Sequence, residues 1–155
     1  MYKLIQTTFA IFGLTFFFYV AAPSQKIGSQ AIGTNRTTPQ VFAGSPAFAE
    51  VLLRKTEFTA ELESLLPDYT DEYPKVKELR FALGALQTEI DRLSKIDQAN
   101  AGRLTLALGR LIVRKVELET DVWNLLRTYK DEHPDVKRAK RKVDIYEAAI
   151  KEILG

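Results

Sequence analysis

The sequence predicts an all-α protein of tandem-duplicated antiparallel helical hairpins that follow an N-terminal signal or anchor segment. Three observations predict this class: a thirteen-residue motif recurs without a gap sixty residues later, apolar residues around each copy follow a seven-residue repeat, and a charge-free run lies near the N-terminus. A seven-residue apolar repeat indicates an amphipathic helix packed against another. Two arrangements of the four expected helices fit this pattern: a four-helix bundle, or two hairpins stacked end to end as a longer coiled coil.

The N-terminal segment, residues 1–24, holds the charge-free run, Phe9–Ala22, which follows Lys3. A positive residue before a short apolar core is typical of a secretory signal peptide, and small residues suit cleavage after Ser24. Counted from Leu4 instead, the run is just long enough to span a bilayer and would be kept as a membrane anchor. Both alternatives predict an exported protein, either periplasmic or anchored in the inner membrane and facing the periplasm.

Residues 25–46 are expected to form a flexible polar linker. They are rich in Ser, Gly, Thr, Gln and Pro, and their apolar residues show neither a helical nor a strand period. Asn35-Arg36-Thr37 matches the glycosylation sequon, which matters only in a eukaryotic secretory pathway.

Helical periodicity defines two hairpin repeats, residues 47–96 and residues 97–155. In each repeat an apolar stripe runs up to the motif, breaks there and resumes beyond it, and a short connection of this kind joins antiparallel neighbours. The first repeat places on this stripe Val51, Lys55, Phe58, Leu62, Leu65 and Tyr69, and then Val76, Leu79, Leu83, Leu86, Ile90 and Leu93. The second repeat places on it Leu104, Leu108, Leu111, Lys115, Leu118, Val122, Leu125 and Tyr129, and then Val136, Ala139, Val143, Tyr146, Ile150 and Ile153.

Apolar residues beside the stripe bear on how the hairpins pack. Two stripe positions in every seven favour an extended coiled coil, whereas additional apolar residues favour a thicker bundle. Between the repeats, Asp97–Gly102 offers an interruption and new helix-start signals. The additional apolar residues are Leu53, Ile112, Val113 and Trp123.

The repeated motif, Leu65–Lys77 and Leu125–Lys137, is interpreted as a turn between two helices. Pro74 and Pro134 lack an N–H and disfavour helical geometry in the residue before them, but the first position of a new helix tolerates proline. Nearby acids are expected to accept hydrogen bonds from the free amides at that helix start, and each stripe tyrosine is expected to cover the hairpin tip. The turn residues are therefore Tyr69, Asp71, Glu72, Pro74, Tyr129, Asp131, Glu132 and Pro134.

Two lysines, Lys55 and Lys115, occupy stripe positions within an identical Arg-Lys-x-Glu. A polar residue at such a position can fix register and partner choice at some cost in stability. Alternatively, the aliphatic stem covers the stripe while the ammonium group reaches water. On the register hypothesis, leucine at both positions is expected to raise the melting temperature and to scramble the oligomeric state.

A basic run follows the second motif and comprises Lys137, Arg138, Lys140, Arg141 and Lys142. One interpretation is a solvated helix face, because these positions surround the apolar stripe; the other is a patch for anionic lipid, glycan or nucleic acid. The net charge of the chain, +2, is too small to predict nucleic-acid binding, and no nucleic-acid partner is expected.

Few residues suggest catalysis. The chain has no cysteine, so disulfides, thiolate metal sites and thiol catalysis are excluded. His133, the sole histidine, lies among acids, but its counterpart in the first motif is Tyr73, so no ligand set is repeated and we interpret His133 as a turn residue. Neither a glycine-rich phosphate loop nor a nucleotide-binding motif occurs. We therefore expect a non-enzymatic protein with no catalytic residues, no metal and no cofactor.

The second motif reads Leu-Leu-x-x-Tyr-x-Asp-Glu-His-Pro-Asp-Val-Lys over Leu125–Lys137. It resembles the coiled-coil turn of bacterial polysaccharide co-polymerases, the chain-length-determinant and exopolysaccharide-export family. The first motif is similar, with Tyr73 in place of histidine. The resemblance covers the two motifs and implies an envelope-facing helical hairpin. Members of that family carry two membrane spans and often a kinase domain, whereas this sequence shows one apolar segment and no kinase motif, so control of glycan chain length is not carried over.

Together these features predict a non-enzymatic helical scaffold or protein-interaction module of the bacterial cell envelope. Its partners are expected to be proteins that contact its helical surfaces, including further copies in a homo-oligomer, and the membrane if the N-terminal segment is kept. The alternative is an accessory component of polysaccharide export or chain-length control that contacts glycan or anionic lipid through the basic run.

Overall fold

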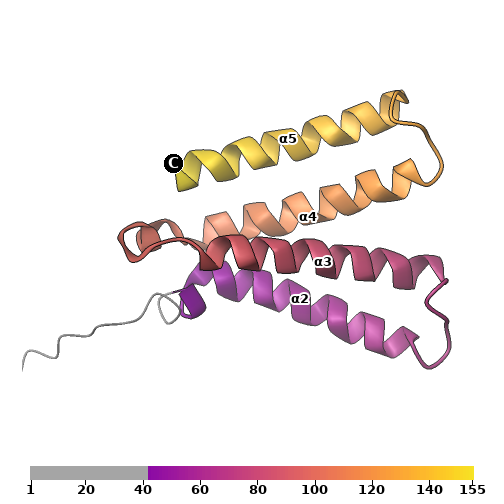
Figure 1. Ribbon diagram of the computed structural model, residues 1–155, viewed down its shortest axis with the longest axis horizontal. Coiled ribbons are helices and arrows are strands. Elements are labelled where there is room, and N and C mark those ends of the chain that lie inside the picture. Colours follow the sequence, from indigo (N-terminus) through magenta and orange to yellow (C-terminus); the bar gives the residue numbers. More distant parts are fainter. Residues whose placement is uncertain (1–41) are drawn as a thin grey trace, which may run out of the picture. The chain divides into compact units, whose positions relative to one another are not determined.

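The structure is a computed structural model that describes residues 42–155. This part of the chain is all-α, as the sequence predicts, and none of its helices is both long and apolar enough to cross a membrane. The predicted signal or anchor segment, residues 1–24, and residues 25–41 of the linker lie outside the described residues. The helices are α2 (Pro46–Leu65), α3 (Pro74–Ser94), α4 (Leu106–Leu126) and α5 (Pro134–Leu154), with a short 3-10 helix, η1 (Gln98–Arg103), between α3 and α4 (Figure 1).

Each helix begins where the sequence supplies a start signal. Ser45 and Thr105 are the N-caps of α2 and α4, and each hydroxyl accepts a backbone N–H from three residues later. Asp97 caps η1 in the same way. Pro74 and Pro134 are the first residues of α3 and α5, as predicted, because the backbone N–H that proline lacks would be unpaired there anyway.

The motif acids do not cap the helices that follow them, contrary to the expectation from the sequence. The N-cap of α3 is Tyr73, whose side chain makes no capping hydrogen bond. The N-cap of α5 is His133, whose Nδ1 accepts the N–H of Asp135 at 3.2 Å. Because proline starts each helix, the N-cap is the residue directly before it, and Asp71 and Asp131 lie too early in the chain to serve.

α4 is the central helix of the bundle. It packs against α2, α3 and α5, while α2 also packs against α3. α5 contacts α4 and η1 and makes no comparable contact with α2, so the four described helices do not close into a ring. Figure 1 shows them side by side, with both repeated turns at one end and η1 at the other. The hairpins therefore pack laterally as a thick bundle, and not end to end.

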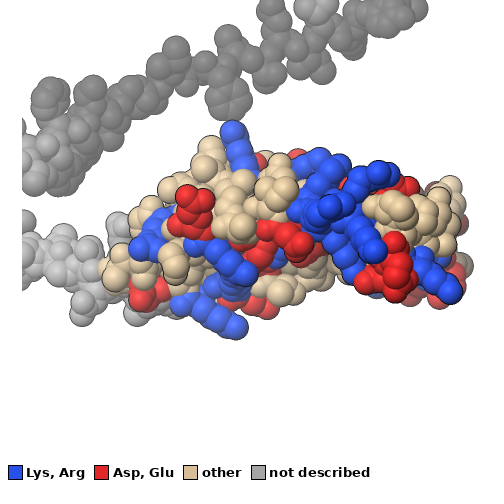
Figure 2. All heavy atoms as spheres, turned by 90° about the horizontal axis from the view of Figure 1, so that it is seen from above, with Lys and Arg blue, Asp and Glu red and all other residues tan. Residues whose placement is uncertain are grey.

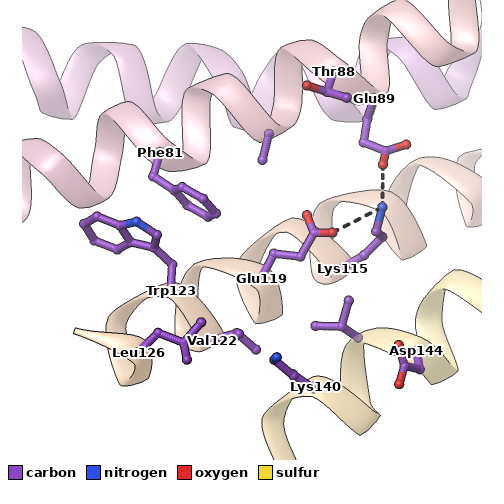
Figure 3. Close-up of a pocket in the computed structure, with 12 residues that line it drawn as sticks. Phe81, Thr88, Glu89, Lys115, Glu119, Val122, Trp123, Leu126, Lys140 and Asp144 are labelled. Carbon is purple, nitrogen blue, oxygen red and sulfur yellow. Dashed lines mark hydrogen bonds and ion pairs between the residues drawn. The ribbon is translucent and has the colours of Figure 1, made fainter. Parts of the chain in front are cut away.

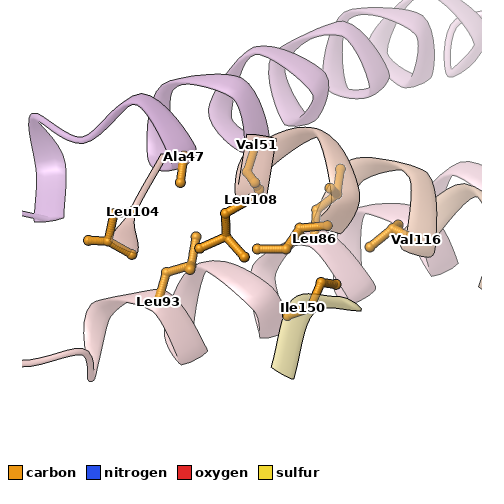
Figure 4. Close-up of a cluster of buried hydrophobic side chains, with 9 residues drawn as sticks. Ala47, Val51, Leu86, Leu93, Leu104, Leu108, Val116 and Ile150 are labelled. Atoms are coloured by element: carbon orange, nitrogen blue, oxygen red, sulfur yellow. The ribbon is translucent and has the colours of Figure 1, made fainter. Parts of the chain in front are cut away.

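The main core lies where the η1 ends of the helices meet (Figure 4). Ile112 and Val116 of α4 are fully buried, although they lie beside the predicted stripe, because a central helix needs a second buried side. Leu53 is 57% exposed, so this additional apolar residue does not thicken the bundle. Stripe residues that are buried as predicted are Val51, Leu62, Val76, Leu79, Leu86, Leu93, Leu104, Leu108, Leu118, Val136 and Ile150.

The close approach of α2 and α4 depends on Gly109. A Cβ atom at this position would lie 2.8 Å from the carbonyl oxygen of Ala47 and 2.8 Å from the Cβ of Glu50. These atoms belong to the backbone or are attached directly to it, so they cannot swing aside. Beside them, the amide of Ala47 donates to the carbonyl oxygen of Leu104 at 3.2 Å. Gly109 therefore sets the spacing between the two hairpins.

We expect Gly109→Ala to lower the free energy of unfolding by about 1–3 kcal/mol, because the added methyl group pushes α2 away from α4. Gly84→Ala is the matched control, since Gly84 is exposed in α3 and a Cβ there meets nothing within 4 Å. Alanine at that position should raise stability by up to about 1 kcal/mol through helix propensity. Urea unfolding followed by circular dichroism measures both changes, and a stabilising Gly109→Ala would contradict the spacing argument.

Candidate functional site

The two turns have the same aromatic structure. Tyr69 stacks on Tyr73 with ring centroids 4.1 Å apart, and Tyr129 stacks on His133 at the same distance. His133 therefore fills a position that the other motif gives to tyrosine. Its ring serves as an aromatic partner and as the N-cap of α5, in agreement with its interpretation as a turn residue.

The motif acids connect each turn to the helix that follows it. Asp71 and Asp131 each pair with the basic residue nine positions later, at 2.5 and 2.6 Å. Glu72 pairs with Lys77, and Glu132 is exposed. These carboxylates are largely in water, so each pair stabilises the fold by little.

The two stripe lysines make equivalent contacts with different partners. Lys55 donates from Nζ to Oε1 of Gln87 at 2.6 Å. Lys115 pairs with Glu147 at 3.1 Å, and Glu147 lies sixty residues after Gln87. Lys55 is half-buried, whereas Lys115 is only 8% exposed. Snorkelling describes Lys55, but Lys115 is the centre of an interior group of ion pairs.

This group, the acid cluster, consists of Lys115, Glu89, Glu119, Glu147 and Arg92, and it joins three helices. The Nζ of Lys115 lies 2.6 Å from Glu89 of α3 and 3.3 Å from Glu119 of α4. Arg92 of α3 reaches Glu147 of α5 at 3.1 Å. Glu89 is 4% exposed, and its Oε2 has no hydrogen-bond partner among the described residues. Arg92 also lies 3.7 Å from Oε2 of Glu89, and Lys151 of α5 lies 3.6 Å from Glu147. Glu89 and Glu147 therefore each have two or more cations nearby, whereas Glu119 pairs only with Lys115 among the described residues.

Burial and charge oppose each other in setting the pKa values of the cluster. Burial lowers the pKa of Lys115, but hydrogen bonds to Glu89 and Glu147 more than offset this, and the pKa lies above its usual range. Burial raises the pKa of Glu119, and the nearby Lys115 charge does not cancel the effect. Burial also acts on Glu147, yet its hydrogen bond to Lys115 brings the pKa below the usual value. Lys115 thus stays charged, and Glu119 is the carboxylate whose charged form another cation would stabilise.

Only one of the two equivalent lysines sits among acids. The first-repeat counterparts of Glu119 and Glu147 are the neutral residues Thr59 and Gln87. The fold therefore does not itself require carboxylates around this lysine, because the first repeat forms the same hairpin without them. Reading the two repeats against each other reveals this difference, and it is the signal in the sequence that could have identified the acid cluster.

A groove of about 570 Å³ opens beside the acid cluster, with α3 and α5 as its walls and α4 as its floor (Figure 3). At one end Phe81 stacks on Trp123 with ring centroids 5.3 Å apart, and Figure 3 shows both rings at a distance from Lys115. Glu119 lies between the two rings and Lys115, with its carboxylate turned toward Lys115. The other apolar lining residues are Ala85, Val122, Leu126 and Val143.

The groove combines apolar walls with one carboxylate, that of Glu119, whose single ion-pair partner among the described residues is Lys115. Its two lysines are already engaged, Lys115 by three carboxylates and Lys140 by Asp131. Oε2 of Glu89 accepts no hydrogen bond from the described residues, although Arg92 lies 3.7 Å away, and burial disfavours the charge of Glu119. Such a surface suits a large apolar group next to a cation. Within residues 42–155, no group of three or more acidic or histidine side chains is arranged to hold a metal ion.

The basic run lies along α5 and is partly neutralised. Arg138 pairs with Asp135, and Lys140 pairs with Asp131. Figure 2 shows basic side chains gathered over part of the face that looks away from α2. The members that are exposed and form no ion pair with the described residues are Lys137, Arg141 and Lys142.

The chain matches no protein-family model, and no match was found among curated proteins or among solved structures. The groove and the acid cluster are therefore interpreted from their own geometry.

We expect Lys115→Met to lower the free energy of unfolding by about 3–5 kcal/mol, because buried Glu89 loses its hydrogen-bonded cation and keeps only Arg92, at 3.7 Å. The register hypothesis predicts a gain in stability when Lys55 and Lys115 are replaced together by leucine, whereas the ion pairs around Lys115 predict a loss when this lysine alone is removed. Lys55→Met, the matched control from the first repeat, loses only a contact with a neutral amide and should cost less than about 1 kcal/mol. Chemical denaturation at neutral pH measures both, and equal losses would argue against a special role for the acid cluster.

Proposed function

We propose that this protein is an exported, non-enzymatic helical interaction module of the bacterial cell envelope, which binds protein partners through its exposed helical surfaces. The observation that supports this proposal is the groove between α3 and α5. Grooves between helices are a recurrent binding mode for amphipathic helices, which insert apolar side chains at helical spacing.

The lining of the groove matches the side chains of such a partner. The stacked Phe81 and Trp123, with Leu126 and Val143, offer an apolar surface to leucine or phenylalanine. Glu119 offers a carboxylate whose charge burial disfavours and whose single ion-pair partner among the described residues is Lys115. A partner helix with a lysine or arginine beside its apolar stripe would satisfy both, because the long basic side chain covers apolar surface with its stem and reaches the acid with its charged end.

Placement in the envelope is supported by the sequence of the N-terminal segment. The charge-free run Phe9–Ala22 is typical of a signal peptide or anchor. The resemblance of Leu125–Lys137 to the turn of polysaccharide co-polymerases points to the same compartment. These features suggest a hairpin module that faces the periplasm, either free or held at the inner membrane.

Photo-crosslinking in the producing bacterium tests this proposal. A benzophenone amino acid at Leu126, which is 42% exposed beside the groove, is expected to capture a small set of envelope proteins. The same amino acid at exposed Lys95, at the end of α3 next to η1, is the control and should capture none of them. Cell fractionation with N-terminal sequencing should place the protein in the periplasm or inner membrane. Recovery in the cytoplasm alone, or identical products from both positions, would contradict the proposal.

A second candidate function is accessory contact with anionic lipid or glycan during polysaccharide export. The observation in its favour is the exposure of Lys137, Arg141 and Lys142 on α5 without ion-pair partners in the described part of the chain. Such unpaired cations attract an anionic surface.

For this second function, replacing Lys137, Arg141 and Lys142 together by glutamate is expected to abolish preferential sedimentation with phosphatidylglycerol vesicles. Vesicles of neutral phosphatidylcholine correct for binding through the N-terminal segment. Unchanged preference for the anionic vesicles would exclude the basic run as a lipid contact.

A further inference from the structure

The two repeats are related like successive units of a stack. A shift of sixty residues carries α2 onto α4 and α3 onto α5. α3 of the first unit packs on α4 of the second. A two-fold relation between the units would require α5 to pack on α2 in the same way, and α5 makes no comparable contact with α2. The described bundle is therefore open, with one free face on α2 and another on α4 and α5.

The free face of α2 carries apolar residues at positions that are buried inside the chain. Leu52 is 42% exposed, whereas its equivalent Ile112 is fully buried. Leu53 is 57% exposed, whereas its equivalent Val113 packs against the main core. α2 thus presents to solvent the side that α4 uses to contact the preceding unit.

The free face of α5 has the corresponding property. Ile145 is 67% exposed, the most exposed of the large apolar residues described. Its equivalent in α3 is Ala85, which packs against the main core. The two free faces therefore carry the same kind of apolar residue that closes the internal junction.

Charged residues at the internal junction are repeated in complementary form at the free faces. Arg54 pairs at 2.6 Å with Glu117 of the following unit, and it also pairs with Glu57 of its own unit. Arg114 is the equivalent of Arg54, and it pairs with Glu117 of its own unit as Arg54 pairs with Glu57. Stacking would place Arg114 next to Glu57 of another copy, just as Arg54 lies next to Glu117 within the chain. The arginine–glutamate pair of the internal junction would thus recur between copies.

The aromatic contact between Phe81 and Trp123 also has a complementary counterpart at the free faces. Within the chain, Phe81 of α3 stacks on Trp123 of α4. The equivalent of Phe81 in the second unit is Arg141, and the equivalent of Trp123 in the first unit is Glu63. Stacking would therefore bring Arg141 of one copy next to Glu63 of the next. Both are exposed, and neither forms an ion pair with the described residues of its own chain. The aromatic contact inside the chain would become a salt bridge between copies.

From these matches we propose that copies of this protein associate head to tail, with the α4–α5 face of one copy on the α2 face of the next. The inference rests on the proposed function as an interaction module, and it names a second copy of the chain as a partner. Contacts of this kind use two different surfaces and leave one of each free, so they propagate.

The junction between copies is wider than the one within the chain. Ala49 stands at the position equivalent to Gly109, where a Cβ atom would collide with the backbone of the preceding unit. Association is therefore expected to be weaker than packing within the chain and to reverse on dilution. Ala49→Gly should tighten it.

Sedimentation velocity over about a hundredfold range of concentration tests the proposal. The sample is the full-length protein as the expression host processes it. Oligomers that grow with concentration are expected. Ile145→Arg and Leu52→Arg should each weaken association by at least about tenfold. Leu126→Arg is the matched control, because Leu126 has the same 42% exposure as Leu52 but lies beside the groove. Circular dichroism should show all three variants folded.

Mixing the variants distinguishes this arrangement from a symmetric one. Ile145→Arg retains an intact α2 face and Leu52→Arg retains an intact α5 face, so an equimolar mixture should form dimers that neither variant forms alone. Likewise, Arg141→Glu should weaken association and Glu63→Arg in the same chain should restore it. A monomer at every concentration, or a failure of the mixture to dimerise, would overturn the proposal. The groove crosslinks from Leu126 concern a different surface, so a negative result here would leave the proposed function standing.

Discussion

A helix that is buried on two sides must find a partner for each of them, and α4 imposes this constraint on the whole bundle. Its predicted stripe faces α5 through residues such as Leu118, while Ile112 and Val116 fill a second buried side. One hairpin alone supplies a partner for only one side. The first hairpin therefore has to dock laterally, and Gly109 makes room for it by admitting the backbone of α2 to close range.

The helices and turns could be predicted from the sequence because local chemistry determines them. Proline at the start of α3 and α5 decides where each helix begins, whatever surrounds it, and the apolar repeat decides which side is buried. The same proline explains why the motif acids are not the caps, since it makes Tyr73 and His133 the N-cap residues. The lateral packing was not determined by the sequence pattern, because a stripe identifies a buried side but does not identify the helix that covers it.

Local sequence does not predict the acid cluster, for a related reason, and only comparison of the two repeats points to it. Lys55 and Lys115 sit in the same Arg-Lys-x-Glu, so their local sequences are almost alike. The ammonium group of Lys115, however, lies between α3 and α5 and pairs with a carboxylate on each. Its burial is a property of the junction between the repeats. Burying Lys115 and Glu89 is costly, and a well-packed apolar pair would often be at least as stable. The presence of these charged groups at the junction is consistent with selection for pairing specificity, whereas the first repeat manages with Thr59 and Gln87.

The placement of the turns gives the molecule a direction. Both motifs lie at one end, while the start of α2 and the C-terminal residue Gly155 lie at the other (Figure 1). A helix of 21 residues such as α3 extends about 30 Å, so the turns stand that far from the end that holds η1 and Gly155. A label or surface attachment at Gly155 would hold the protein by its base and leave the aromatic turns as the free tip, which makes the orientation of immobilised protein controllable.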